Sequence, residues 1–302
     1  MAASSRKRTA YLFVGPFLGL FAVFFIFPLA YEFRLSLSRT VMGVSSFAGW
    51  SNYQLAFHDA AFWNGMGRVA LFGVLQLVSV QGLGLALALF LDGPWIKAKT
   101  LLRLVYLLPY AVPGVIAALM WGFLLAPGLD PMLKLLGSVS GGAPNLLATG
   151  SLLYVVVAIV TWEWAGYNMT LYYAALTALP LEIYEAARLD GCSEFQLAVR
   201  IKVPMLQTMV GLTILLSIIG AMQLFTEPFI LSTITPVSPS YTPNLYAYNM
   251  GFNYGNFNYA ATLSFILAAI TLVLSGSFLW LRTRGAQRGS GHPEVSRQPE
   301  GG

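Results

Sequence analysis

Six long apolar runs constrain this sequence more than any other feature. They cover residues 10–31, 69–91, 104–126, 152–176, 205–225 and 259–280. Each is close to the ~20 residues that a helix needs to cross a bilayer. Because lipid offers no hydrogen-bond partner to backbone N–H and C=O groups, such runs fold as helices. With 57% apolar and 10% charged residues, the chain is too apolar for a soluble domain. The sequence therefore predicts an all-α polytopic membrane protein with six transmembrane helices.

The basic residues indicate how these helices are oriented. Of the 17 Lys and Arg residues, all but Arg34, Arg39, Arg68 and Lys134 fall in connections on one side of the predicted topology. Because Lys and Arg gather on the cytosolic side of membrane proteins, both termini are predicted to lie in the cytosol. This placement accounts for the net charge of +5 without a nucleic-acid partner.

The basic cluster at residues 6–8 also fits the start of a signal peptide. No small-x-small cleavage pattern follows the first apolar run, and that run is long enough to span a bilayer. We therefore expect a retained first transmembrane helix.

A charged island at residues 181–204 separates the fourth and fifth apolar runs and carries signals for helix ends. Pro180 can open a helix. Gly191 can adopt the left-handed conformation that ends one. Residues 193–196 (Ser-Glu-Phe-Gln) match a capping box for a second helix, which Pro204 stops or kinks. The pattern predicts a rigid helix–glycine–helix hairpin outside the lipid.

Polar and aromatic residues inside the fourth and fifth runs mark a candidate pathway for a solute. Glu163 lies well inside the fourth run, where a carboxylate costs about 2.5–3.5 kcal/mol and should face protein or water. Aromatic rings can stack on the C–H faces of a sugar while amide and carboxylate oxygens bind its hydroxyls. The alternative is a structural polar patch between helices. The candidate pathway residues are Glu163, Trp164, Tyr167, Asn168, Gln223 and Glu227.

Two motifs connect these features to a known family. Glu185-Ala186-Ala187, Gly191, Ile201 and Val203-Pro204 resemble the EAA loop of ABC-importer permeases, with Val203 in place of Leu. The external segment, with Gly49, Asn52-Tyr53 and Phe62-Trp63-Asn64, is similar to carbohydrate-uptake permeases. The chain thus resembles the permease subunit of a type I ABC importer of the maltose and glycerol-3-phosphate permease-like family.

The resemblance implies a type I ABC-importer permease fold in a prokaryotic plasma (inner) membrane. It implies a second homologous permease, a pair of cytosolic ABC ATPases that bind ATP and Mg, and an external binding protein that delivers a sugar, polyol or oligosaccharide. The spans beside the EAA loop would line the substrate cavity. The residues implied in coupling to the ATPase are Glu185, Ala186, Ala187, Asp190, Gly191, Ile201 and Pro204.

The residues argue against an enzyme. The sequence has no Gly-x-x-x-x-Gly-Lys-Ser/Thr loop, so ATP hydrolysis is assigned to a partner subunit. It has one cysteine, Cys192, and no Cys/His cluster, so we expect no metal and no cofactor in this chain. Two alternatives stay open: an ion-coupled secondary transporter that uses Glu163 and Glu227 as proton sites, and a structural membrane scaffold, which leaves Glu163 unexplained.

The predicted organisation follows the order of the chain. Residues 1–9 form a cytosolic N-terminus, and residues 10–64 form the first transmembrane helix with an external segment. Residues 65–282 form the transport domain, with the EAA loop at 181–204, and residues 283–302 form a disordered cytosolic tail.

Overall fold

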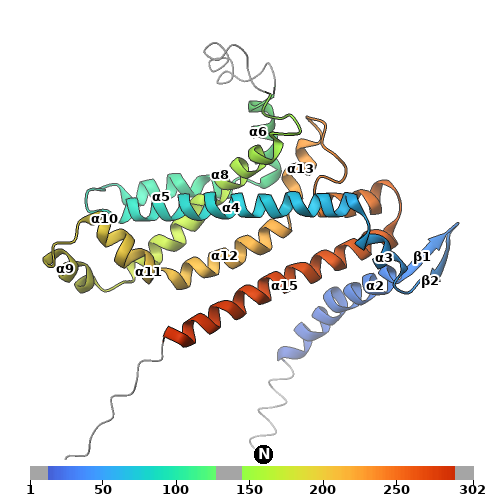
Figure 1. Ribbon diagram of the computed structural model, residues 1–302, viewed down its shortest axis with the longest axis horizontal. Coiled ribbons are helices and arrows are strands. Elements are labelled where there is room, and N and C mark those ends of the chain that lie inside the picture. Colours follow the sequence, from blue (N-terminus) through green and yellow to red (C-terminus); the bar gives the residue numbers. More distant parts are fainter. Residues whose placement is uncertain (1–12, 127–144, 290–302) are drawn as a thin grey trace, which may run out of the picture. The chain divides into compact units, whose positions relative to one another are not determined.

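The computed structural model describes residues 13–126 and 145–289, with side chains up to residue 284. Within this part of the chain, five helices are long and apolar enough to cross a bilayer, and two further helices joined by a sharp bend pass the same test together (Figure 1). They are Phe13–Ser36, Ala60–Asp92, Leu152–Thr177, Gln207–Leu231 and Phe257–Arg284. The bent pair is Lys99–Ala111 and Gly114–Leu124, and it raises the number to six when it is counted as one broken span. The predicted all-α membrane fold is confirmed. The expected N-terminus at residues 1–9 lies outside the described residues.

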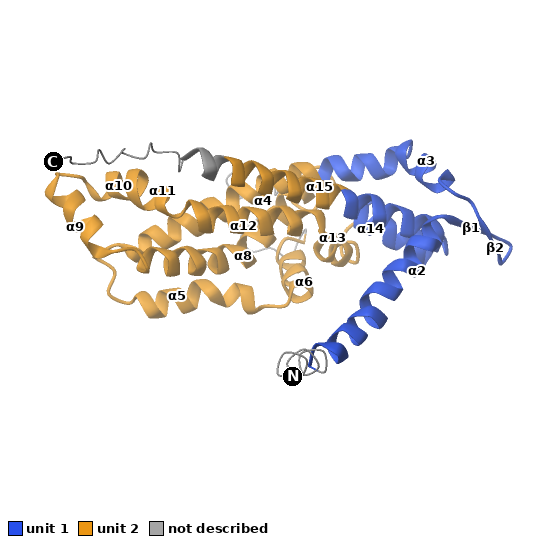
Figure 2. Cartoon of the chain, turned by 90° about the horizontal axis from the view of Figure 1, so that it is seen from below, with its two compact units in different colours: residues 1–68, 238–269 blue, residues 69–237, 270–302 orange. Residues whose placement is uncertain are grey.

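The chain divides into two compact units, and each unit is made of two segments that are separate in the sequence (Figure 2). One unit combines residues 1–68 with Ser238–Ala269, and the other combines Val69–Val237 with residues 270–302. Segments from distant parts of the sequence therefore pack together within each unit.

The first unit is built from helices and one small β-hairpin. Its elements are π-helical η1 (Ala22–Ile26), α2 (Phe27–Ser36), β1 (Ser38–Val41), β2 (Val44–Phe47), α3 (Ser51–Phe57), α14 (Pro243–Tyr248), π-helical η4 (Asn249–Asn253) and the first parts of α4 (Ala60–Asp92) and α15 (Phe257–Gly289). The strands pair antiparallel, from Ser38 opposite Phe47 to Val41 opposite Val44. Met42 and Gly43 both have positive φ, as a two-residue hairpin turn requires. The sequence did not predict this hairpin, because its exposed strands lack an apolar–polar alternation.

Asp59 joins three helices of the first unit. Its Oδ1 accepts hydrogen bonds from the N–H groups of Ala61 at 2.9 Å and Phe62 at 3.4 Å, which caps α4. Its Oδ2 accepts from the hydroxyls of Tyr246 in α14 at 2.8 Å and Tyr259 in α15 at 2.7 Å. Burial alone would raise the pKa of Asp59, but these hydrogen bonds outweigh it and lower the pKa below its usual 3.8.

The second unit is a helical bundle. Helices α4, α5 (Lys99–Leu107), α8 (Leu152–Thr177) and α12 (Gln207–Met222) run alongside one another (Figures 1 and 2). Its apolar core comprises Ala88, Leu91, Met169, Tyr172, Leu176 and Leu206. The remaining elements are 3₁₀-helical η2 (Leu108–Ala111), α6 (Gly114–Leu124), α9 (Leu181–Leu189), α10 (Glu194–Leu197), π-helical η3 (Ala198–Lys202), α11 (Val203–Met205), α13 (Thr226–Leu231) and the last part of α15.

Helix α15 extends to Gly289, through residues that the sequence assigned to the tail. Arg, Ala and Gln are good helix formers, so the helix continues past the apolar run. The rest of the predicted tail, residues 290–302, lies outside the described residues.

Two spans of the second unit are interrupted. Pro109 and Pro113 bracket a break between η2 and α6, where the chain bends by 91°. Proline lacks an N–H and excludes the preceding residue from the helical region, which explains this break. The second break separates α12 from α13 at residues 223–225, with Phe225 at φ −143°. Pro228, the third residue of α13, lacks the N–H that would bond the oxygen of Leu224, which explains this break. The sequence analysis treated residues 205–225 as one uninterrupted run.

We predict that Asp59→Ala destabilises the first unit by about 1 kcal/mol or more, since it removes a helix cap and two hydroxyl acceptors. Asp59→Asn should lose less stability, because an amide oxygen still caps α4.

The lowered pKa of Asp59 also predicts a pH dependence of stability. The carboxylate stabilises the fold fully above its unfolded pKa of 3.8, and this contribution is lost as the pH falls through the lowered folded pKa. Thermal unfolding of the detergent-solubilised protein between neutral and acid pH measures both effects. Equal pH profiles for the parent and Asp59→Asn proteins would contradict the second.

Candidate functional site

The second unit contains a partly open cavity of about 520 Å³. Its walls come from α4, η2, α8, α12 and α13, with α4 contributing Phe72, Gln76 and Val80. Both interrupted spans reach it, because Tyr110 at the first break and Gln223 at the second line the wall. The size and the mixed apolar and polar lining are typical of a pocket for a small molecule.

Five of the six candidate pathway residues line this cavity: Trp164, Tyr167, Asn168, Gln223 and Glu227. Glu163 does not. Its side chain is buried, with 5% of its surface exposed. Its Oε1 and that of Glu227 lie 3.6 and 3.9 Å from the position that a Cβ on Gly114 would occupy. The two carboxyl groups therefore approach each other at the start of α6, beside the cavity wall.

Three aromatic rings form a cluster on one wall. Tyr110 stacks on Tyr167 with 4.7 Å between ring centroids, and Trp164 meets Tyr110 edge-on at 5.3 Å. Sequence analysis missed Tyr110, although its place between Pro109 and Pro113 is a usable signal, since a broken helix directs side chains and free backbone groups into a cavity. The cluster presents ring faces and edges to the cavity.

Buried polar side chains connect the helices beside this cluster. The hydroxyl of Tyr172 in α8 donates to Gln81 Oε1 in α4 and lies 2.5 Å from Thr213 Oγ1 in α12. Gln81 Nε2 donates to Ser217 Oγ at 2.9 Å. Thr213 and Ser217 both line the cavity, so this network fixes the positions of polar groups in its wall.

Gln76 is a second residue that sequence analysis missed. It lines the cavity and is 6% exposed, and its Oε1 has no hydrogen-bond partner among the described residues. A buried amide oxygen without a partner costs free energy, so it is well suited to a ligand that brings a donor. The two Gln residues inside an apolar run, Gln76 and Gln81, were the available signal.

Glycines allow the helices around the cavity to approach closely. A Cβ on Gly166 of α8 would overlap the backbone carbonyl of Tyr106 in α5. A Cβ on Gly84 of α4 would lie 3.0 Å from the Asn168 Cβ and 3.2 Å from the Ala165 oxygen, both in α8. Helix–helix contacts of this kind are typical of small residues in membrane bundles.

A hairpin of α9 and α10 lies at the opposite end of the unit from α6 and α13 (Figures 1 and 2). Gly191 has φ +81°, and the N–H groups of Gly191 and Cys192 donate to the oxygens of Arg188 and Ala187 at 3.0 Å each. This is a Schellman motif, and it ends α9. The predicted helix, glycine turn and second helix are present.

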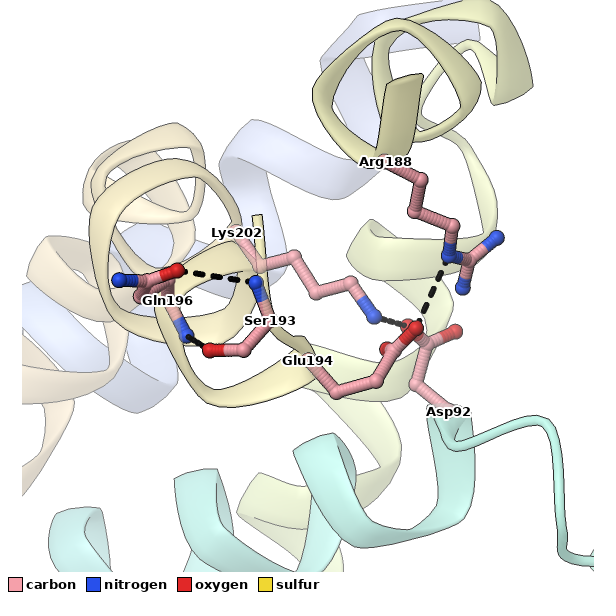
Figure 3. Close-up of polar contacts among 6 residues, drawn as sticks. All are labelled: Asp92, Arg188, Ser193, Glu194, Gln196 and Lys202. Atoms are coloured by element: carbon pink, nitrogen blue, oxygen red, sulfur yellow. Dashed lines mark hydrogen bonds and ion pairs between the residues drawn. The ribbon is translucent and has the colours of Figure 1, made fainter. Parts of the chain in front are cut away.

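The predicted capping box begins α10 (Figure 3). The N–H of Gln196 donates to Ser193 Oγ at 3.3 Å, and the N–H of Ser193 donates to Gln196 Oε1 at 2.9 Å. Pro204 does not end the helical segment, because η3 and α11 follow α10 and lead into α12. The residues directly before the proline form the π-helix η3, in which the hydrogen bonds run to the fifth residue back.

The candidate coupling residues occupy two sides of this hairpin. Glu185, Ala186, Asp190, Gly191 and Pro204 are exposed. Ala187 is buried and packs with Tyr184 and Leu197, and Ile201 packs against the same cluster. Sequence analysis missed Leu189 and Phe195, whose side chains are 89% and 77% exposed.

A membrane-spanning bundle with a cavity between interrupted helices and a rigid hairpin at one end is the fold of a permease subunit. The chain belongs to the family described as "Binding-protein-dependent transport system inner membrane component", whose model matches residues 82–288. It is therefore a multi-pass inner-membrane protein and a component of a transport system that depends on a binding protein. This membership removes the support for the ion-coupled and scaffold alternatives.

Similar proteins agree with this assignment. The chain is 30% identical over 292 residues to the arabinooligosaccharides transport system permease protein AraP of Bacillus subtilis, covering 95% of this chain and 92% of AraP. It is 30% identical over 281 residues to the lactose transport system permease protein LacF of Rhizobium radiobacter, covering 90% and 94%. A bacterial ABC transporter involved in the import of alginate contains a chain of the same fold, with a TM-score of 0.82, 18% identity and coverage of 93% and 96%.

We predict that Gly166→Ala destabilises the bundle by about 1–3 kcal/mol, because the new methyl group must push α5 and η2 away from α8. Gly82→Ala in α4 is the matched control, since a Cβ there meets nothing within 4 Å. Thermal unfolding in detergent measures the difference. Equal stability of the two variants would show that α5 is not held against α8 as described.

Proposed function

We propose that the chain is the membrane subunit of an ATP-driven importer for uncharged saccharides. It forms the translocation pathway with a second homologous permease, while two cytosolic ATPases bind the α9–α10 hairpins and an external binding protein delivers the sugar. The observation that carries this proposal is the composition of the cavity wall: three clustered aromatic rings beside side-chain amides and a carboxyl group.

The cavity chemistry supports a sugar as the solute. Tyr110, Tyr167 and Trp164 offer apolar ring surfaces to the C–H faces of a pyranose or furanose. The unpartnered oxygen of Gln76 accepts from a hydroxyl, and the amide of Gln223 both donates and accepts. The relatives named for arabinooligosaccharide and lactose transport agree with this chemistry.

The charge of the cavity supports an uncharged sugar over an acidic one. Glu227 lines the wall, with Glu163 behind it, and none of the described lining residues is Lys, Arg or His. Inside a protein, like charges repel much more strongly than in water, and burying an unpaired charge is costly. A uronate or a sugar phosphate would have no cationic partner on this wall, whereas a hydroxyl finds acceptors.

The outer face of the hairpin supports an ATPase as the partner. Leu189 and Phe195 project from α9 and α10 with most of their surface exposed, beside the acidic Glu185 and Asp190. Exposed apolar side chains rimmed by charged ones mark protein interfaces. Since this chain has no phosphate-binding loop, ATP and Mg are bound by that partner.

The hairpin can transmit ATPase closure because it is rigid and continuous with two spans. The Schellman motif and capping box fix its shape, and it connects α8 directly to the segment that leads into α12. When ATP brings the ATPases together, the hairpin moves as a body and tilts α8 and α12, which both line the cavity. The cavity then changes the side of the membrane to which it opens.

We predict that Trp164→Ala lowers saccharide uptake at least roughly fivefold, because loss of a ring that stacks on the ligand costs on the order of 1–3 kcal/mol, as for base–aromatic stacking. Uptake of labelled neutral oligosaccharides by proteoliposomes containing the full complex measures this. Trp95→Ala is the matched control, since Trp95 is 74% exposed and outside the cavity.

A uronate or sugar phosphate should not compete with the neutral substrate for uptake. Strong competition by either would overturn the assignment to uncharged saccharides.

We predict that Gly191→Ile uncouples ATP hydrolysis from uptake while the protein still inserts into the membrane. Gly191 has φ +81°, which a β-branched residue adopts only with strain, so the angle between α9 and α10 must change. Gly191→Asn is the matched control, because Asn tolerates the left-handed region. The readout is sugar transported per ATP hydrolysed in proteoliposomes. Full coupling in Gly191→Ile would remove the hairpin from the transmission mechanism.

A further inference from the structure

A buried ion pair connects the hairpin segment to α4 (Figure 3). Lys202, the last residue of η3, places its Nζ 2.5 Å from Oδ2 of Asp92, the last residue of α4. The two side chains are only 6% and 14% exposed. The other ion pair among the described residues, Arg188–Glu194 within the hairpin, is 42% and 33% exposed. A buried pair cannot separate without leaving a charge unpaired, so it holds its partners together far more firmly than an exposed one.

Lys202 contacts more than its carboxylate. Its Nζ lies 4.9 Å from the centroid of the Tyr184 ring in α9, and the Tyr184 hydroxyl donates to the Leu176 oxygen in α8 at 3.3 Å. The ammonium group also lies at the carboxyl end of α4, where the helix dipole favours a cation. Lys202 is therefore held between the coupling helix α9 and the end of α4.

Helix α4 differs from α8 and α12 in its covalent connection to the hairpin. Residues 178–180 join α8 to α9, and η3 and α11 lead into α12, so those two spans must move with the hairpin. Asp92 and Lys202 are 110 positions apart in the sequence. Helix α4 can follow the hairpin only through non-covalent contacts, and the ion pair is at its end.

Movement at Asp92 reaches the cavity through α4 itself. Val80, Gln76 and Phe72 line the cavity, the first of them about 18 Å along the helix from Asp92 at 1.5 Å per residue. Between these positions, Gly84 brings α4 into close contact with α8. The helix can therefore pivot at Gly84, with the ion pair at one end and the cavity wall at the other.

We propose that Asp92 and Lys202 are positioning residues that make α4 follow the α9–α10 hairpin, so that ATP-driven motion reaches the cavity wall through α4 as well as through α8 and α12. This inference rests on the proposed function, because it needs an ATPase that moves the hairpin. It adds a third moving wall to the cavity, and it assigns a role to two charged residues that the family motif does not include.

The variants separate this role from simple stability. Lys202→Met leaves Asp92 buried and unpaired, and its assembly can fail for that reason alone. The double variant Asp92→Asn/Lys202→Met leaves no buried charge and is expected to assemble, since replacing both members of a buried pair by neutral groups is often neutral for stability. It lacks the ion pair between α4 and η3, however. Lys97→Met is the matched control: Lys97 is exposed, lies near the end of α4 and has no ion-pair partner among the described residues.

The test uses the full complex in proteoliposomes, in a Cys192→Ser background with spin labels at Phe90→Cys on α4 and Val199→Cys on η3. Both positions are exposed, at 53% and 49%. In the parent and in Lys97→Met, the distance between labels should be the same without nucleotide and with ATP, because α4 and the hairpin segment move together. In the double variant, ATP should change this distance, and sugar transported per ATP should fall at least roughly fivefold, the lower end of typical coupling between sites.

The outcomes are separable. If the double variant keeps the parent's label distances or the parent's transport per ATP, the ion pair does not make α4 follow the hairpin. This inference is then overturned, and the proposed function stands. If the double variant fails to assemble while the parent assembles, the ion pair has a structural role, and its proposed role in moving α4 is likewise overturned. If the parent and Lys97→Met show no ATP-dependent sugar uptake, the proposed function itself fails.

Discussion

The requirement that every backbone N–H and C=O group be hydrogen-bonded in an apolar environment governs this structure. An uninterrupted helix meets it alone, and a break must be compensated by protein or by a polar cavity. The second unit has two interrupted spans, and both are interrupted at the same place: Tyr110 beside the first break and Gln223 at the second line one cavity. The cavity and the breaks thus depend on each other: the breaks direct polar groups into the cavity, and the cavity spares the backbone groups at the breaks from contact with lipid.

Close helix packing stabilises this arrangement. The short helices beyond the breaks, α6 and α13, pack against each other, and a Cβ on Gly122 would lie only 3.0 Å from Leu231. Gly166 allows the backbone of Tyr106 to lie against α8, which places Tyr110 on Tyr167. In a bilayer, helices gain little from burying apolar surface against one another, so glycine contacts and buried polar networks carry more of the association. The aromatic wall of the cavity is a consequence of that packing.

Local signals in the sequence predicted the spans, the glycine turn and the capping box, because each depends on residues within a few positions. The prolines at 109 and 113 are a local signal of the same kind for the break between η2 and α6. Sequence analysis did not predict the break after Met222, although Pro228 in the first turn of α13 is a usable signal, or the hairpin at residues 38–47, whose strands are exposed on both faces. It also missed the pairing of Asp59 with two tyrosines and of Asp92 with Lys202. Such pairs join residues more than 100 positions apart, and only the folded chain brings them together.

The hairpin combines two kinds of surface for physically different tasks. Its outer face carries Leu189 and Phe195, whose exposed apolar groups gain free energy when a soluble partner covers them and can be released again. Lys202 in η3, directly after the hairpin, has a charge that is already paired and would lose its partner if η3 slid past Asp92. The exposed pair Arg188–Glu194 has neither property, since water replaces each partner at little cost. In the mechanism we propose, the hairpin acts as a lever, which needs a reversible contact at the driven end and a fixed one at the load. This distribution of apolar surface and buried charge supports that proposal.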